Sequence, residues 1–133
     1  MRMKGYHANI ESLTEANDKF RRVLYTGHNI QLVLMTLQPG EEIGAETHDD
    51  RDQFFRFEAG TGEVDVDETT YRVEADDVVI VPQGACHNVR ATGSEPLRMY
   101  TVYGPPEHLD GKVHQTKAEA DADEEHFDGR TSE

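Results

Sequence analysis

The chain has 133 residues, which suffices for one domain with a single hydrophobic core. It carries 27 acidic against 13 basic residues, for a formal net charge of -14. A chain of this charge repels nucleic acids and anionic membrane surfaces, so we expect neither as a partner. The acidity fits two explanations equally well, adaptation to high salt or an ordinary acidic bacterial protein.

The single cysteine, Cys86, excludes a disulfide within the chain and favours a reducing compartment. No cationic and then apolar leader opens the chain, and no apolar run approaches the roughly 18 residues of a membrane span. We therefore expect a cytoplasmic protein. Cys86 directly precedes His87 on an expected strand, so it points to the opposite face, where a packed thiol is expected rather than a nucleophile.

The first third of the chain predicts one short helix and two strands. Residues 9–17 can form a helical turn capped by Asn9, with Ile10 and Leu13 on its buried side. Residues 19–25 alternate like a strand. Residues 30–37 are apolar on both faces, as expected of a strand that packs a core on one side and meets a second sheet or subunit on the other.

Short strands separated by turn residues then follow one another without intervening helices, at 43–48, 53–58, 63–67, 70–74, 78–81, 87–91 and 97–103. This pattern predicts an all-β fold, a small antiparallel β-barrel or jelly roll with short N- and C-terminal helical segments.

Three parts of the chain are distinguished. Residues 1–29 are expected to form an N-terminal arm that packs on the barrel or swaps into a partner, and residues 30–106 the barrel itself. Residues 107–133 form an acidic C-terminal extension, whose stretch 116–127 has good helix formers but few apolar positions. We expect that stretch to be a solvated helix or a frayed tail.

The chemistry is concentrated between Gly40 and Gly60. Glu46 and His48 are two residues apart and project from the same face of an extended strand. Gln53 follows a polar turn that can fold the next strand back beside them, so one hairpin offers three ligands. A fourth candidate, His87, begins a strand after the Pro/Gly turn at 82–84.

These residues make the chain resemble the cupin superfamily, as a small single-domain member of the kind described as similar to mannose-6-phosphate isomerase. The first cupin motif reads Gly40-x5-Glu46-x-His48-x4-Gln53-x6-Gly60. The second reads Asp76-x5-Pro82-x-Gly84-x2-His87-x3-Ala91. The resemblance implies a metal site at Glu46, His48, Gln53 and His87.

Four positions depart from the family pattern. Glu46 replaces the first histidine, Gln53 the glutamate, and Asp76 and Ala91 the glycine and asparagine of the second motif; Asn88 lies near but on another face. Glu46 and Gln53 still offer an oxygen, which indicates a retuned site. Two imidazoles, a carboxylate and an amide oxygen suit Mn, Fe, Ni, Co or Zn better than Ca or Mg. Gln53 is a ligand or a hydrogen-bonding neighbour of one.

Other side chains have expectations of their own. Phe55 and Phe57 share the face of Gln53 and should line the barrel as core. Tyr100 and Tyr103 lie on different faces, and alternation leaves open which one points inward. Four histidines outside the motifs are expected in loops or the tail: His28, His108, His114 and His126. Two of these, His108 and His114, are considered as covers of the barrel mouth.

The resemblance implies a metal-dependent enzyme, of isomerase or tautomerase type, acting on a small polyhydroxy or keto compound such as a sugar. Glu46 is the expected catalytic base, beside or bound to the metal. Two alternatives stay open: an iron or nickel dioxygenase, and a non-catalytic barrel that binds a small ligand. A small molecule is the expected partner, and the resemblance also implies a homodimer.

Overall fold

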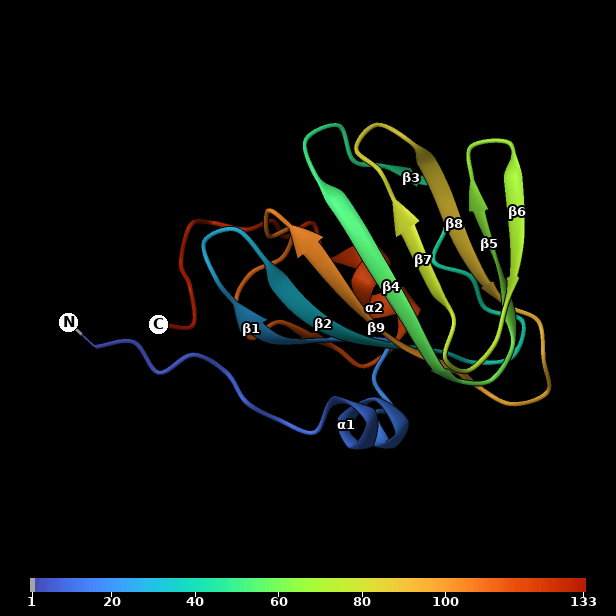
Figure 1. Cartoon of the computed structure of the whole chain (residues 1–133), viewed down its shortest axis with the longest axis horizontal. Helices are drawn as coiled ribbons and strands as arrows, with labels where there is room; N and C mark the ends of the chain where they lie inside the picture. The colour runs from blue at the N-terminus through green and yellow to red at the C-terminus, as the bar shows by residue number, and fades with distance from the viewer. Residues whose placement is uncertain (1) are drawn as a thin grey trace.

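The computed structural model describes residues 2–133 as two antiparallel sheets that face each other, with two short helices (Figure 1). The elements in chain order are α1 (Ile10–Ala16), β1 (Arg21–Thr26), β2 (Gln31–Leu37), β3 (Glu46–Thr47), β4 (Asp52–Ala59), β5 (Gly62–Val66), β6 (Thr69–Val73), β7 (Val78–Val81), β8 (Cys86–Ala91), β9 (Leu97–Gly104), β10 (Val113–His114) and α2 (Lys117–Ala122). The predicted all-β fold is therefore confirmed.

The larger sheet has the order β10-β1-β2-β9-β4-β7 and the smaller one β3-β8-β5-β6. Strand alternation places one face of each sheet inward, and these faces form one apolar core between the sheets. Phe55 and Phe57 on β4 are both 0% exposed, with stacked rings 6.2 Å apart. Their expected place in the core is confirmed.

Helix α1 explains why β2 is apolar on both faces. Asn9 caps the helix by accepting a hydrogen bond from the Ser12 backbone amide, as predicted. The helix contacts β2, β4 and β9, and Asn17 just beyond it donates to Thr36 on the outer face of β2. Within one chain, this helix covers part of the face for which a second sheet or subunit was expected (Figure 1).

Two turn positions show how the motif glycines act. Gly60 has a φ of +83°, and a Cβ there would lie 2.3 Å from the Pro96 carbonyl oxygen, so only glycine fits. Asp76 stands where the second motif usually has glycine, and it keeps a left-handed φ of +75°. Aspartate tolerates this conformation better than most residues, and its carboxylate accepts a hydrogen bond from Arg56.

The expectation for Cys86 was half right. Its side chain points away from the core, but it is exposed rather than packed. The frayed-tail alternative for the C-terminal extension is wrong, because the extension is hydrogen-bonded to the barrel. β10 pairs with β1, the Phe127 amide donates to the Glu107 carbonyl, and the Ser132 amide donates to the Thr26 carbonyl.

Helix α2 of that extension buries no residue, so its solvated character is confirmed. Among residues 2–133, no helix combines the length and the apolar character needed to cross a membrane.

Candidate functional site

Three predicted ligands meet where β3 runs beside β8. Glu46 and His87 are direct partners across this pair, and His48 follows β3 on the face of Glu46. One ligand atom from each residue can be chosen so that all three lie within 4.8 Å of one another. The spacing of Glu46 and His48 thus has the predicted effect, and His87 joins them as predicted.

Gln53 lies on a strand that is not the hairpin partner expected for β3. β3 pairs with β8, whereas β4 pairs with β7 and β9, so the turn between β3 and β4 crosses from one sheet to the other. The predicted hairpin is therefore wrong. Gln53 is nevertheless buried on the inner face of β4, where its Nε2 donates to Thr101 Oγ1 at 3.0 Å. Its Oε1 is buried without a partner.

Glu46 and His48 stabilise each other's charge. Glu46 Oε2 lies 3.2 Å from His48 Nε2. This neighbour raises the pKa of His48, although burial opposes the shift. Burial also works against the charge of Glu46, but His48 and other nearby cations outweigh it and lower the pKa of the carboxyl. Glu46 is consequently an anion at neutral pH.

His87 is held in the neutral form that a metal needs. It is 2% exposed, and its ring lies 5.4 Å from the ring of His48 and 6.0 Å from that of Phe55. Burial lowers its pKa. Its Nδ1 is buried without a hydrogen-bond partner.

The polar atoms at this site fit a metal ion better than they fit one another. Although Glu46 is close to His48 Nε2, that nitrogen has no partner in hydrogen-bonding geometry, like His87 Nδ1 and Gln53 Oε1. Leaving such groups unpaired costs about 1–3 kcal/mol each. The ligand atoms of Glu46, His48 and His87 lie within 4.8 Å of one another, so one metal ion could be held by all three. The triad therefore suits a divalent metal, and Gln53 stays a predicted fourth ligand.

Tyr103 on β9 lies beside this cluster and settles which tyrosine points inward. It is 2% exposed, its ring meets the His48 ring edge-on at 6.0 Å, and it pairs with Gln53 across β4 and β9. Burial raises the pKa of its phenol, so the hydroxyl keeps its proton. The sequence did not place Tyr103 at the site, because β9 carries a tyrosine on each face.

Glu107, which the sequence did not single out, orients His48 from the other side. Its Oε2 lies 3.4 Å from His48 Nδ1 and 2.8 Å from Arg51 Nη1. Arg51 also donates to the Pro106 carbonyl, which ties the β3–β4 turn to the start of the extension. A carboxylate behind a ligating imidazole fixes its ring and its tautomer.

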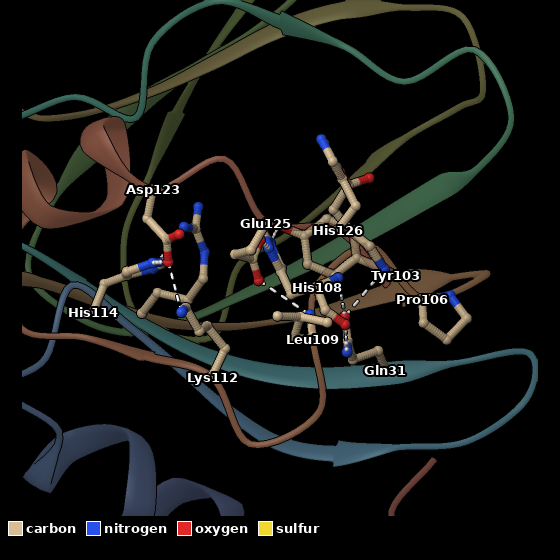
Figure 2. Close-up of polar contacts among 12 residues, drawn as sticks. Gln31, Tyr103, Pro106, His108, Leu109, Lys112, His114, Asp123, Glu125 and His126 are labelled. Carbon is tan, nitrogen blue, oxygen red and sulfur yellow. Dashed lines mark hydrogen bonds and ion pairs between the residues drawn. The ribbon is translucent and has the colours of Figure 1, made fainter. Parts of the chain in front are cut away.

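The extension forms one wall of a pocket of about 650 Å³ that includes Glu46 and His48. Figure 2 shows how it is held: His108 Nδ1 lies 2.8 Å from Glu125, and Gln31 contacts the His108 backbone. His108 lines this pocket, and its role as a cover of the barrel mouth stays a prediction. His114 instead lies behind the pocket wall on β10, bonded to Asp123. Both are buried, whereas His28 and His126 are exposed.

Comparisons with known proteins agree with this geometry. A family model described as "Cupin domain" matches residues 33–103. The uncharacterized protein YrkC of Bacillus subtilis (strain 168) is 43% identical over 128 residues, which cover 92% of this chain and 69% of that protein. The crystal structure of BH2720 from Bacillus halodurans is 43% identical and has a TM-score of 0.89, with 90% of this chain and 96% of that chain covered.

A shorter match is to 5-nitrosalicylic acid 1,2-dioxygenase of Bradyrhizobium sp, which is 33% identical over 67 residues, or 50% of this chain and 32% of that enzyme. The family model spans 71 of the 133 residues (33 to 103) and includes every predicted ligand. With its two facing sheets and its Glu-His-His cluster, this chain belongs to the cupin domain family.

Proposed function

We propose that this cupin is a metal-dependent enzyme that moves protons on a small polyhydroxy or keto compound, as an isomerase or tautomerase does. The observation that carries the proposal is the convergence of Glu46, His48 and His87 at a pocket large enough for such a substrate. A divalent metal held there would polarise adjacent hydroxyl and carbonyl oxygens as a Lewis acid.

Glu46 supplies the base at this site. Glu46 is ionised and reaches the pocket, so it can accept a proton from a carbon next to a carbonyl. The Tyr103 phenol keeps its proton and donates a hydrogen bond to His108 Nε2 at 3.3 Å, because His108 Nδ1 donates to Glu125; Tyr103 therefore supports the wall of the site. Glu107 and Arg51 hold His48 in position rather than taking part in proton transfer.

Metal analysis and hydrogen exchange together test this proposal. The purified protein should bind one equivalent of Co²⁺ or Mn²⁺, and His48→Ala should bind it at least tenfold more weakly. In deuterium oxide, the metal-loaded protein should exchange the carbon-bound hydrogens of hydroxyacetone or a small ketose faster than buffer containing the same metal. Glu46→Gln should abolish the acceleration. A protein that binds no metal would refute the proposal.

A dioxygenase is the second candidate, favoured by the match to 5-nitrosalicylic acid 1,2-dioxygenase and by the two-histidine, one-carboxylate set. Oxygen consumption by the Fe²⁺-loaded protein would select it, whereas exchange that is unchanged without oxygen would select the isomerase. If His48→Ala and His87→Ala left small-molecule binding intact, the non-catalytic alternative would be favoured.

A further inference from the structure

Arg21, at the start of β1, is a buried cation that has no anionic partner among residues 2–133. It is 8% exposed, yet it lines the same pocket as Glu46 and His48. None of the ion pairs among residues 2–133 involves it, so no carboxylate of that range lies within 4 Å of its guanidinium. Its Nε is buried with no hydrogen-bond partner. A buried charge in this state is costly unless something pairs with it.

In the described part of the chain, the Arg21 side chain makes one hydrogen bond, and that bond brings it no countercharge. Its Nη1 lies 3.2 Å from His114 Nδ1. Guanidinium nitrogens only donate, so Nδ1 must accept and His114 carries its proton on Nε2. That Nε2 then donates to Asp123 at 2.9 Å, while Asp123 is itself paired with Lys112 at 2.6 Å (Figure 2). His114 is therefore neutral in this arrangement.

Most carboxylates of the pocket already have a nearer cation than Arg21. Four of them are paired with a cation: Glu46 with His48, Glu107 with Arg51, Asp121 with Lys117 and Asp123 with Lys112. Glu125 accepts a hydrogen bond from His108, whose pKa burial lowers, and Glu124 is exposed; within residues 2–133 neither forms an ion pair with Arg21. The Phe20 ring, 5.3 Å from the guanidinium carbon, compensates the charge of Arg21 only in part.

We propose that Arg21 binds a carboxylate of the substrate, so that the substrate is a small hydroxy or keto acid whose carboxylate lies at Arg21 while its hydroxyl or carbonyl oxygens face the triad. This assignment rests on the proposed metal-dependent function and narrows its substrate class. The guanidinium fork matches a carboxylate in geometry as well as in charge. A neutral sugar would leave Arg21 unpaired.

Pyruvate and hydroxyacetone make a suitable pair of probes, because they have similar size and pyruvate carries a carboxylate where hydroxyacetone carries a hydroxymethyl group. Their dissociation constants would be measured on the Co²⁺-loaded protein, from its visible spectrum or by calorimetry. A carboxylate also binds the metal directly, so preference for pyruvate in the wild type is not diagnostic. The diagnostic quantity is how far Arg21→Gln reduces that preference.

Arg22→Gln is the matched control, because Arg22 is the next residue, carries the same charge and lies on the exposed face of β1. Arg21→Gln should reduce the preference for pyruvate by about 10- to 100-fold, as expected for a hydrogen-bonded charge, and should leave Co²⁺ affinity within about threefold. Arg22→Gln should change neither by more than about twofold. Equal preferences in the two variants would overturn the assignment.

Two further measurements separate the possible failures. If Arg21→Gln does not fold, Arg21→Lys replaces it, because lysine keeps the charge but lacks the two parallel donors of the guanidinium. Arg21→Lys should prefer pyruvate less strongly than the wild type does and more strongly than a neutral replacement would. If its preference for pyruvate equalled that of the wild type, Arg21 would not bind the carboxylate through two hydrogen bonds. If the wild type does not bind Co²⁺, the proposed function fails. The same two probes, followed by NMR on the metal-free protein, would then test Arg21 alone, and absence of any Arg21-dependent pyruvate binding would overturn the assignment.

Discussion

Replacing His87 with leucine should make the metal-free protein more stable while abolishing metal binding. The histidine is 2% exposed, and its Nδ1 is buried without a partner. Such a group costs about 1–3 kcal/mol, whereas leucine fills a similar volume without a polar atom. Part of this gain is offset by the lost contact with the Phe55 ring, a contact type worth about 0.5–1.5 kcal/mol.

The expected net gain is about 1 kcal/mol, which for a chain of this length raises Tm by about 3–5 °C. Added metal should stabilise only the wild type. At a concentration of 100 times Kd, it stabilises the wild type by about 2.7 kcal/mol and should leave His87→Leu unchanged. Thermal unfolding of chelator-treated protein, with and without added Co²⁺ at pH 8, measures both effects.

His114→Leu is the control for burial alone. His114 is 3% exposed, but both of its ring nitrogens have partners, in Arg21 and Asp123. Its replacement should destabilise the protein by about 1–3 kcal/mol, because it removes the hydrogen bond that the buried Arg21 guanidinium donates to His114. If metal-free His87→Leu were destabilised as much as His114→Leu, His87 would be a structural residue, and the reasoning that assigns it to a metal would fail.

Three further predictions concern other parts of the chain. Asp76→Gly should raise Tm by a few degrees, since glycine adopts the left-handed φ without strain and the exposed contact with Arg56 contributes little. Burial lowers the pKa of His108, even though Glu125 opposes the shift; the unfolded chain therefore binds more protons as pH falls below about 6.5, and stability decreases. The loss of Tm between pH 7.5 and 5.5 should accordingly be smaller in His108→Gln, and an equal loss would refute this. We also propose that the expected homodimer uses the outer face of β7, where Ile80 is 62% exposed; light scattering should find two copies in the wild type and one in Ile80→Lys, and a monomeric wild type would contradict this.

The sequence predicted most strands and the meeting of Glu46, His48 and His87, because both depend on local pattern. β7 has the predicted bounds, and β4 differs from them by one residue at each end. The prediction that Glu46 and His48 share a face required only the two-residue period of an extended chain. The prediction that His87 begins a strand required only the turn before it. The expected strand at 43–48 is shorter in the structure, however, because only Glu46–Thr47 forms a ladder.

What the sequence did not predict depends on pairing between distant segments. Alternation shows which residues share a face but not which strands are neighbours, so the polar turn after His48 was interpreted as a hairpin although it crosses between sheets. The inward direction of Tyr103 and Arg21 depends on register with β2 and β4. Glu107 belongs to an extension with few apolar residues, which gives no periodic signal.

The division of the site between the sheets has a consequence for how this protein can change. Glu46, His48 and His87 all belong to or adjoin the smaller sheet, whereas Arg21, Gln53 and Tyr103 come from the larger one. Under the two proposals above, the smaller sheet carries the triad that would hold the metal, and the larger sheet carries Arg21, which would bind the substrate carboxylate. Replacements on the larger sheet can alter which compound is accepted while the metal stays the same, so new specificities can evolve without rebuilding the metal centre.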